Sequence, residues 1–495
     1  MDVSQRMTAP SSSRLRTLAS YTAWMLSAQI ATVLLQFGYA GVTSRLVPDT
    51  GFGAVAVAMS LLAVVTLIAQ GGLGEATART PELHRGKLSF LVLVAIGLGI
   101  AAGLILILVA RPWAGLWDAP DAVGPARLIA VTAFLAPLSG LLLGVQRRLG
   151  TFRAIAISMV ATSAVGMAIG VVAVILSPGP MTLLVSPIAA SVLLAVVSLI
   201  LTRRHWWARP DAAAAQADLG FAWRILGITM LAYLSLNIGK WSVSRWVGTD
   251  ALGQWNRADV LTAAPIGQGT RALTQAVYPE FRHDIGVQSR TRQAWTDYLL
   301  LVAWASFPFA AILAGVAPSA TTIIFGPGWG LAAAIAPLVA IQYGIFAVES
   351  VLANALESVG QFRLRVWTAL ASVAVIAAGA AVTKVTGSWA AALVALIAAS
   401  LLQHLLQVVF TARFGALDGW SVAKGYSCSL AASAVLGGAA ALISAGMLGR
   451  MCPLAAVAGA VILIAVAVAG IVVRRHLPPL KILARYRSRE FAPEP

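Results

Sequence analysis

The chain of 495 residues has few charged side chains, since Asp, Glu, Lys and Arg make up 11% of it and hydrophobic residues 59%. A soluble protein of ordinary composition carries about 25% charged residues. The deficit extends along the whole chain, and no long polar stretch interrupts the apolar segments. These absences exclude a soluble globular protein and predict an all-α polytopic membrane protein without a soluble domain.

The sequence lacks the residue patterns for metal binding, ATP binding and disulfide formation. The five histidines show no metal-ligand spacing, and no Gly-x-x-x-x-Gly-Lys-Ser/Thr loop for ATP is present. The two cysteines, Cys428 and Cys452, are separated along one predicted helix and its exit, so a disulfide is not expected. We therefore expect no metal, no cofactor and no ATP-driven reaction. A membrane enzyme needs a catalytic acid or base near a membrane face, usually with a sizeable outer loop, and the short predicted outer loops disfavour one.

Basic residues outnumber acidic ones by 35 to 18, a net charge of +17. Such an excess is common in proteins that bind nucleic acid, but here most of the Lys and Arg residues flank apolar segments, as membrane topology requires. We expect membrane lipids, and not nucleic acid, around this chain.

Apolar stretches of about 20 residues, the length that crosses a bilayer, predict about fourteen transmembrane helices. The first is too long for a signal-peptide core and is expected to be retained. The predicted stretches are 20–44, 52–74, 88–110, 124–146, 153–177, 181–202, 223–247, 251–277, 296–317, 330–356, 366–384, 388–412, 423–446 and 453–473.

The distribution of positive charge supports this count. With a cytoplasmic N-terminus, 26 of the 35 Lys and Arg residues fall on the inner side and six on the outer side. A wrong number of helices would mix the two groups, because cytoplasmic loops carry the excess of Lys and Arg. Both termini are therefore predicted to be cytoplasmic. The three remaining cations, Lys240, Arg257 and Arg271, lie inside predicted helices.

A shift of 200 residues aligns the segment from Val47 with the segment from Val247, and Gly53 falls on Gly253. Both segments contain an outer turn and the start of the second helix of a six-helix unit. Two such units share one orientation and are related by a pseudo-two-fold axis along the membrane normal, with a substrate site between them. The predicted division is a cytoplasmic N-terminal segment 1–19, a six-helix half 20–202, a cytoplasmic linker 203–222, a second half 223–413, two extra helices 414–473 and a basic cytoplasmic tail 474–495.

The intramembrane cations belong to polar faces of predicted helices. A lone cation at the bilayer centre costs about 2.5–3.5 kcal/mol on insertion scales, so it requires a wet or anionic environment. Three helices carry such faces at helical spacing. Their members are Arg257, Gln268, Arg271 and Gln275 on one helix, Tyr233, Asn237, Lys240 and Ser244 on the preceding helix, and Gln29, Thr32, Gln36, Tyr39 and Thr43 on the first helix.

These faces favour a water-filled cavity for an anionic substrate, because a guanidinium group matches phosphate oxygens in a bidentate manner. Other interpretations stay open. Each cation can extend to the lipid headgroups, Arg257 can pair with Asp259 or another carboxylate, and the polar face of the first helix can serve helix packing. Arg45, at the first outer turn, fits an interfacial or structural role better than ligand binding.

Three carboxylates lie in or next to helices: Glu75, Asp259 and Glu349. Each is a candidate for binding a coupling cation or proton, as intramembrane acids often do. Pro265, in the middle of the helix that carries Arg257, predicts a kink and a candidate hinge.

Three stretches carry a resemblance to a known family. The first runs SRLVPDTGFGAVAVA from Ser44 and continues with QGGLGEATART from Gln70. The second is LGQWNRADVLTAAPIGQGTRALTQAVYPEF from Leu252, and the third is IIFGPGW from Ile323, followed by APLVAIQ and ALESVGQ. In this order they resemble the polysaccharide flippases (O-antigen or Wzx type and teichuronic-acid type) of the multidrug/oligosaccharidyl-lipid/polysaccharide (MOP) exporter superfamily. The resemblance covers most of the chain, and Trp255 stands where the family usually has Tyr.

This resemblance implies a transporter and not an enzyme. It would move a polyprenyl-diphosphate-linked oligosaccharide from the inner to the outer leaflet of a bacterial cell membrane by alternating access, for cell-surface polysaccharide export. Polymerases, ligases or glycosyltransferases are the partners that such a substrate implies. Two alternatives within the superfamily are a lipid II flippase and a multidrug/cation antiporter. The antiporter predicts acids and not cations in the cavity, so Lys240 and Arg257 argue against it.

Overall fold

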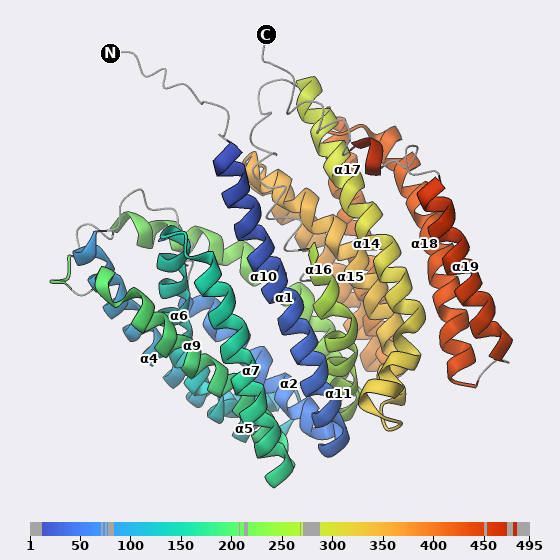
Figure 1. Cartoon of the computed structure of the whole chain (residues 1–495). Helices are drawn as coiled ribbons and strands as arrows, with labels where there is room; N and C mark the ends of the chain where they lie inside the picture. The colour runs from blue at the N-terminus through green and yellow to red at the C-terminus, as the bar shows by residue number, and fades with distance from the viewer. Residues whose placement is uncertain are drawn as a thin grey trace, which may run out of the picture. The chain divides into compact units, whose positions relative to one another are not determined.

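The fold was analysed in a computed structural model of the whole chain. It describes residues 12–70, 73–74, 77, 84–206, 208–211, 216–267, 269–270, 288–449, 453–472 and 479–482. These residues are overwhelmingly helical, and no strand occurs among them. The helices are α1 (Ser12–Leu46), α2 (Asp49–Gln70), α4 (Arg85–Leu116), η1 (Pro120–Ala122), α5 (Val123–Leu128), α6 (Ala130–Arg148), α7 (Phe152–Leu176), α8 (Pro180–Leu183), α9 (Val185–Trp206), α10 (Gln216–Trp246), α11 (Thr249–Ala258), η3 (Asp259–Ala263), α14 (Gln288–Phe325), α15 (Gly330–Ser358), α16 (Phe362–Thr386), α17 (Trp389–Arg413), α18 (Gly419–Met447) and α19 (Pro453–Val472) (Figure 1).

Every one of the fourteen predicted stretches overlaps a helix. Ten helices in the described part of the chain are long and apolar enough to cross a membrane. The all-α, multi-pass membrane class is therefore confirmed, whereas the count of fourteen spans stays a prediction.

The chain divides into two compact units. Unit 1 comprises residues 1–39, 58–111 and 123–227, and unit 2 comprises residues 40–57, 112–122 and 228–495. Unit 2 thus contains the outer turn between α1 and α2 and the tip after α4, although both come early in the chain. The division into two six-helix halves and flanking segments, drawn from the sequence, stays a prediction.

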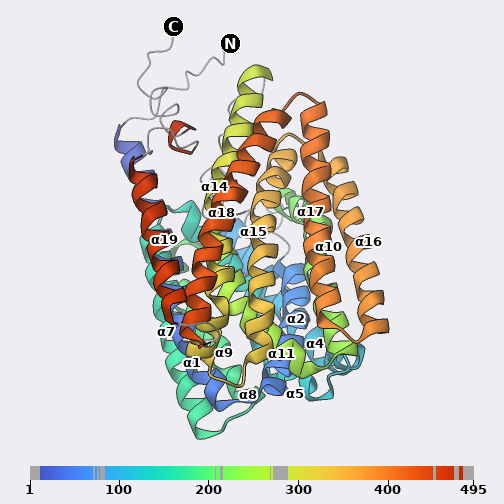
Figure 2. The same ribbon diagram turned by 90° about the vertical axis from the view of Figure 1, so that its right-hand side faces the viewer.

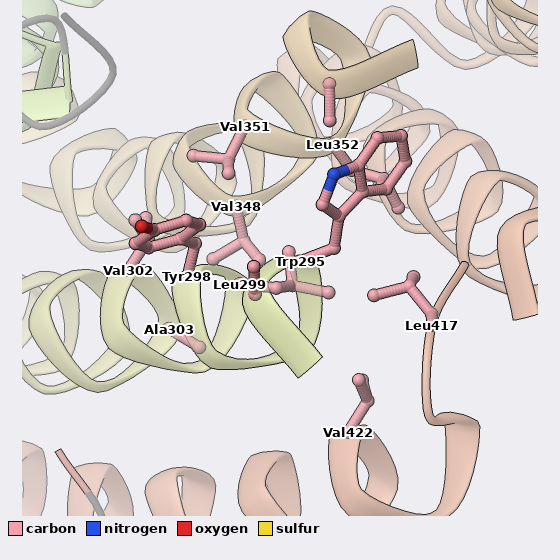
Figure 3. Close-up of a cluster of buried hydrophobic side chains, with 12 residues drawn as sticks. Trp295, Tyr298, Leu299, Val302, Ala303, Val348, Val351, Leu352, Leu417 and Val422 are labelled. Carbon is pink, nitrogen blue, oxygen red and sulfur yellow. The ribbon is translucent and has the colours of Figure 1, made fainter. Parts of the chain in front are cut away.

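In unit 2, α14, α15, α17 and α18 pack around a cluster of buried apolar side chains. Trp295 and Leu299 of α14 meet Val348 and Leu352 of α15, and Leu417 closes the cluster (Figure 3). Lipid tails are as apolar as these side chains, so close packing, and not removal from water, holds such helices together. The cluster therefore stabilises unit 2 through contact density.

Small residues allow the helices of unit 2 to approach closely. A Cβ at Gly315 of α14 would lie 2.6 Å from the carbonyl oxygen of Gly437 in α18, and a Cβ at Gly446 of α18 would lie 2.7 Å from Cβ of Ala456 in α19. Both views show α18 and α19 side by side (Figures 1 and 2). This use of glycine and alanine at helix contacts is typical of membrane proteins.

The internal repeat is visible as a reciprocal contact in unit 2. A Cβ at Gly53 would collide with the carbonyl oxygen of Thr249, and a Cβ at Gly253 would collide with the carbonyl oxygen of Asp49. Gly53 thus approaches residue 249, and Gly253 approaches residue 49. The two contacts are equivalent in the repeat, because positions 49 and 249, like 53 and 253, differ by 200. A two-fold axis that relates the starts of α2 and α11 produces this self-complementary pattern.

Candidate functional site

Lys240 and Asp259 form an ion pair in unit 2. The Lys240 Nζ lies 2.5 Å from Asp259 Oδ2, and the two side chains are 25% and 16% exposed. Asp259 begins η3, a short π-helical turn that continues α11, and α10 supplies Lys240. The carboxylate of Asp259 neutralises the ammonium group of Lys240, a charge that would be costly without a partner inside an apolar helix. The sequence placed both residues in the site but did not pair them.

Arg257 is buried, with 8% of its surface exposed. Its guanidinium carbon lies 4.1 Å from the centre of the Phe52 ring, and NH2 donates a hydrogen bond to Asn256 Oδ1 at 3.0 Å. A cation over an aromatic face gains about 0.5–2 kcal/mol, more when it is desolvated. Phe52 begins the apolar part of α2, so the outer end of this helix helps to hold a charge that α11 provides.

Tyr233, Asn237 and Lys240 lie at successive turns of α10, as their spacing predicted. Asn237 Nδ2 donates to the carbonyl oxygen of Tyr233 at 2.9 Å, and both side chains are half-buried. Further along the helix, Ser244 Oγ donates to the carbonyl oxygen of Trp117 at 2.8 Å. The polar face of α10 therefore exists, and its outermost member binds the tip that follows α4.

Gln29 and Gln36 belong to α1 in unit 1, where both are half-buried. The amide oxygen of Gln29 is buried and accepts no hydrogen bond from the described residues. On the same face, Tyr39 Oη donates to the carbonyl oxygen of Leu183 at 3.2 Å. This face combines a packing contact with an unsatisfied acceptor, and its role in binding stays a prediction.

Pro265 lies two residues after the end of the π-helical turn Asp259–Ala263. Proline has no N–H to donate and its ring crowds the preceding turn, so the wider turn before it is where the helix accommodates the disruption. Such turns are frequent at functional sites, and the predicted hinge role of Pro265 stays a prediction.

Four of the predicted site residues lie outside the described residues: Gln268, Arg271, Gln275 and Glu75. Of the polar face predicted for the helix that carries Arg257, the structure therefore places Arg257 alone.

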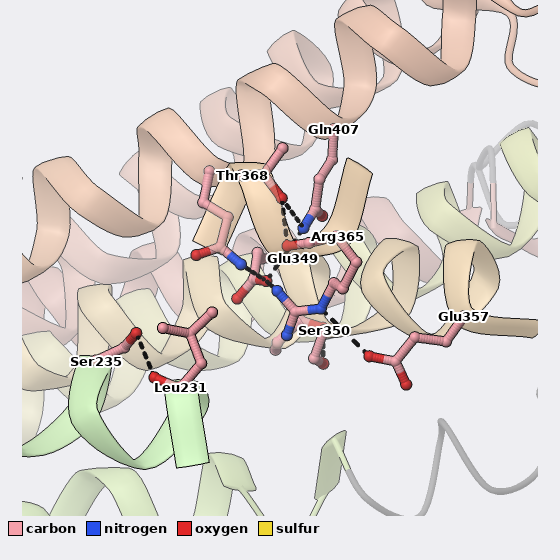
Figure 4. Close-up of polar contacts among 10 residues, drawn as sticks. Leu231, Ser235, Glu349, Ser350, Glu357, Arg365, Thr368 and Gln407 are labelled. Atoms are coloured by element: carbon pink, nitrogen blue, oxygen red, sulfur yellow. Dashed lines mark hydrogen bonds and ion pairs between the residues drawn. The ribbon is translucent and has the colours of Figure 1, made fainter. Parts of the chain in front are cut away.

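Glu349 lies at the centre of a second buried polar cluster. It is 3% exposed, and its Oε1 accepts a hydrogen bond from Gln403 Nε2 at 2.7 Å and lies 3.5 Å from NH1 of Arg365. Arg365 Nε also binds Glu357 Oε1 at 3.3 Å, and Gln407 Nε2 lies 3.5 Å from the same oxygen of Glu349 (Figure 4). The cluster joins α15, α16 and α17 and borders a pocket of about 40 Å³.

The sequence missed most of this cluster. Arg365 was assigned to a cytoplasmic loop, but its side chain is only 13% exposed and pairs with Glu349. Ser400, Gln403 and Gln407 recur at helical spacing on an otherwise apolar helix, and this pattern was the available signal. Asp259 and Glu349 both have an internal cation in place, so a coupling ion would have to displace or share that partner. Their role in ion coupling stays a prediction.

Gln254 joins three segments of unit 2. Its Nε2 donates to Asp49 Oδ2 at 3.1 Å and to the carbonyl oxygen of Gly328 at 3.0 Å, while its Oε1 accepts from the backbone N–H of Ala332 at 3.0 Å. A buried amide with all three partners fixes their relative positions. Asp49, Gln254 and Gly328 lie one in each of the three stretches that carry the family resemblance.

Comparison with known proteins supports the family resemblance that these three stretches carry. Residues 42–334, more than half of the chain, match the profile of a family described as "Polysaccharide biosynthesis protein". The chain belongs to this family. Among curated proteins, it is 24% identical over 387 residues to the succinoglycan biosynthesis transport protein ExoT of Rhizobium meliloti, and the match covers 77% of each chain.

Two further relatives have names in polysaccharide synthesis. The teichuronic acid biosynthesis protein TuaB of Bacillus subtilis is 20% identical over 54% of this chain and 56% of its own length. The lipopolysaccharide biosynthesis protein WzxC of Escherichia coli is 20% identical over 62% of this chain and 63% of its own.

The fold is shared with two transporters of known structure. The lipid II flippase MurJ in its inward closed conformation aligns with a TM-score of 0.67 over 92% of this chain and 99% of its own, at 11% identity. An inward-facing multidrug resistance MATE transporter of the MOP superfamily aligns with a TM-score of 0.60 over 79% of this chain and 98% of its own, at 14% identity. At these identities the comparison establishes the shared architecture alone.

Proposed function

We propose that this protein is a flippase that moves a polyprenyl-diphosphate-linked oligosaccharide from the inner to the outer leaflet of a bacterial cell membrane. The observation that carries the proposal is Arg257, a cation held 8% exposed inside an apolar helical unit of a polysaccharide biosynthesis family member. A charge buried at this cost is retained where it has a function, and a guanidinium group is the side chain best suited to a diphosphate.

The surroundings of Arg257 support this role. Its guanidinium lies over the face of Phe52, and a charge-assisted bidentate contact with phosphate is about twice as strong as a neutral hydrogen bond. Lys240 is neutralised by Asp259 in this structure and would contribute to the substrate only after this pair rearranges. Arg271, with Gln268 and Gln275, would continue the same face toward the cytoplasm.

We propose alternating access as the mechanism. The diphosphate and glycan enter an inward-open cavity while the polyprenyl tail stays in lipid, and rearrangement of the two halves then opens the cavity outward. Both termini are proposed to be cytoplasmic from the charge distribution. The membrane potential or an ion gradient would drive net export, and one charge crossing 100 mV is worth about 2.3 kcal/mol. Polymerases, ligases or glycosyltransferases of the glycan are the proposed partners.

The test is a flipping assay in proteoliposomes with a polyprenyl-diphosphate-linked oligosaccharide. Arg257→Ala should abolish most of the flipping, Arg257→Lys should retain part of it, and Arg127→Ala, an exposed arginine of α5, should retain all of it. The double substitution Arg257→Ala and Arg271→Ala is the stronger arm. Full transport by a correctly inserted double variant would refute the role of an anionic cavity.

A lipid II flippase is a second candidate, since MurJ aligns over 92% of this chain. Competition separates the two. If lipid II and a polyprenyl-diphosphate oligosaccharide without a peptide are offered together, the proposed function predicts preference for the latter. Exclusive transport of lipid II would favour the second candidate.

A further inference from the structure

A second polar pocket lies between the α1–α2 turn and the α14–α15 turn of unit 2. It has a volume of about 590 Å³, within the range of 300–1,000 Å³ that is usual for small-ligand sites. One wall is formed by residues 44–49 at the end of α1 and in the α1–α2 turn. The other wall is formed by Thr322 and residues 325–329 at the end of α14 and in the turn before α15.

Hydrogen bonds between the walls hold the pocket in shape. Trp329 Nε1 donates to the carbonyl oxygen of Ser44 at 2.9 Å, and Arg45 NH2 donates to the carbonyl oxygen of Ile323 at 2.8 Å. Gln254 donates hydrogen bonds to both Asp49 and Gly328 and so connects the two walls. Gly326 has φ = +104°, a backbone conformation that disfavours other residues, so this turn is built for one shape. A pocket pre-organised in this way loses little entropy on binding.

Arg45 gives this pocket an exposed guanidinium group, and one of its five N–H donors makes the hydrogen bond to Ile323. Asp49, the acid in the lining, already accepts hydrogen bonds from Gln254 and from the N–H of Thr50. The pocket therefore offers a guanidinium group to a ligand that supplies acceptors.

We propose that this pocket binds an acidic sugar residue, one that carries a carboxylate or phosphate, as the exported glycan leaves the protein. Arg45 pairs with the oxyanion in bidentate geometry. Backbone groups of the Gly326–Gly328 turn contact the remaining hydroxyls. The proposal rests on the proposed function for the source of the glycan and on the charge distribution for the outer position of the pocket.

The experiment measures binding of a soluble uronic-acid oligosaccharide to the purified full-length protein in nanodiscs of neutral lipid. A neutral oligosaccharide of equal length is the matched ligand. We expect the acidic ligand alone to bind, and Arg45→Gln to weaken it roughly 10-fold, the value of one charge-assisted contact. Arg45→Lys should lie between the two, and Arg127→Gln should leave binding unchanged. Size-exclusion profile and thermal midpoint verify that each variant folds.

Two outcomes would overturn the proposal: equal binding of the acidic and neutral ligands, or acidic binding that Arg45→Gln leaves intact. A second arm uses nanodiscs of anionic lipid without oligosaccharide. If Arg45 binds the lipid headgroup there and no saccharide binds in neutral nanodiscs, the ligand is a lipid and the glycan assignment is wrong. Failure of the proposed function is distinct, because a wild-type protein that flips no lipid-linked glycan can still be scored for Arg45-dependent saccharide binding.

Discussion

Removing one partner of the ion pair between Glu349 and Arg365 should strongly destabilise unit 2. The Glu349 side chain is 4% exposed and that of Arg365 13%, and both lie among α15, α16 and α17. Removing one partner of a buried pair leaves an uncompensated charge and typically costs 3–5 kcal/mol, about ten times the cost for an exposed pair. The perturbation is Arg365→Ala.

The two partners are not equivalent, and the structure predicts the order of their effects. In Arg365→Ala, Glu349 keeps only the amide groups of Gln403 and Gln407, so we expect a loss of about 3–5 kcal/mol. In Glu349→Gln, Arg365 keeps its ion pair with Glu357 at 3.3 Å, so the loss should be smaller. The double variant Glu349→Gln with Arg365→Gln should recover much of the stability because no unpaired charge stays buried.

The assay is unfolding by SDS in mixed micelles, followed by circular dichroism. Arg245→Ala is the matched control: Arg245 lies 3.2 Å from Asp118, but the two side chains are 40% and 66% exposed. Its loss should be about 0.2–1 kcal/mol. If Arg365→Ala costs no more than Arg245→Ala, or if the double variant is less stable than Arg365→Ala, the reasoning from burial is refuted.

Three further predictions concern single positions. Gly53→Ala and Gly253→Ala should each lower the thermal midpoint, because the new Cβ meets a backbone oxygen. Gly97→Ala in α4 is the control and should keep or raise the midpoint, because no atom lies within 4 Å of the new Cβ. Equal midpoints for all three variants would contradict the close approach at Gly53 and Gly253. Phe52→Leu should lose about 0.5–2 kcal/mol of interaction with Arg257, measured as the coupling in a double-mutant cycle with Arg257→Gln, and zero coupling would exclude the cation–π contact. The hydrogen bond from the Ser421 side chain, with the nearby Arg292, lowers the pKa of Asp418 at the start of α18. Ionised Asp418 therefore stabilises the fold fully above the ordinary carboxyl pKa, and this stabilisation is lost as the pH falls through the lowered pKa. Asp418→Asn should flatten this acid dependence of the thermal midpoint, and an unchanged profile would contradict the prediction.

Composition and charge predicted the class of protein because a bilayer restricts the backbone. Only a helix satisfies its own hydrogen bonds in lipid across about 20 residues, and loop charge follows orientation, so apolar length and the Lys and Arg positions were sufficient to locate the helices. The repeat was also readable, since Gly53 and Gly253 keep their identity where two backbones approach. Polar faces could be assigned within one helix because its periodicity is fixed.

Pairing between helices was not readable from the sequence. Lys240 and Asp259 are 19 positions apart, and Glu349 and Arg365 are 16 apart with a turn between them, so helical spacing does not relate them. Arg365 follows a turn and is preceded by Arg363, which made it look like one more cytoplasmic charge. The rotation of α16 about its axis decides that it is buried.

The sequence by itself determined that this chain is a helical membrane protein and carries the motifs of a polysaccharide biosynthesis family. The tertiary structure alone decided that Lys240 is neutralised by Asp259, that Arg257 lies over Phe52, and that Ser44 and Arg45 line a pocket with the α14–α15 turn. The reason is physical: local spacing fixes what shares one face of a helix, whereas a partner across a helix contact depends on the rotation and approach of two helices, which packing sets.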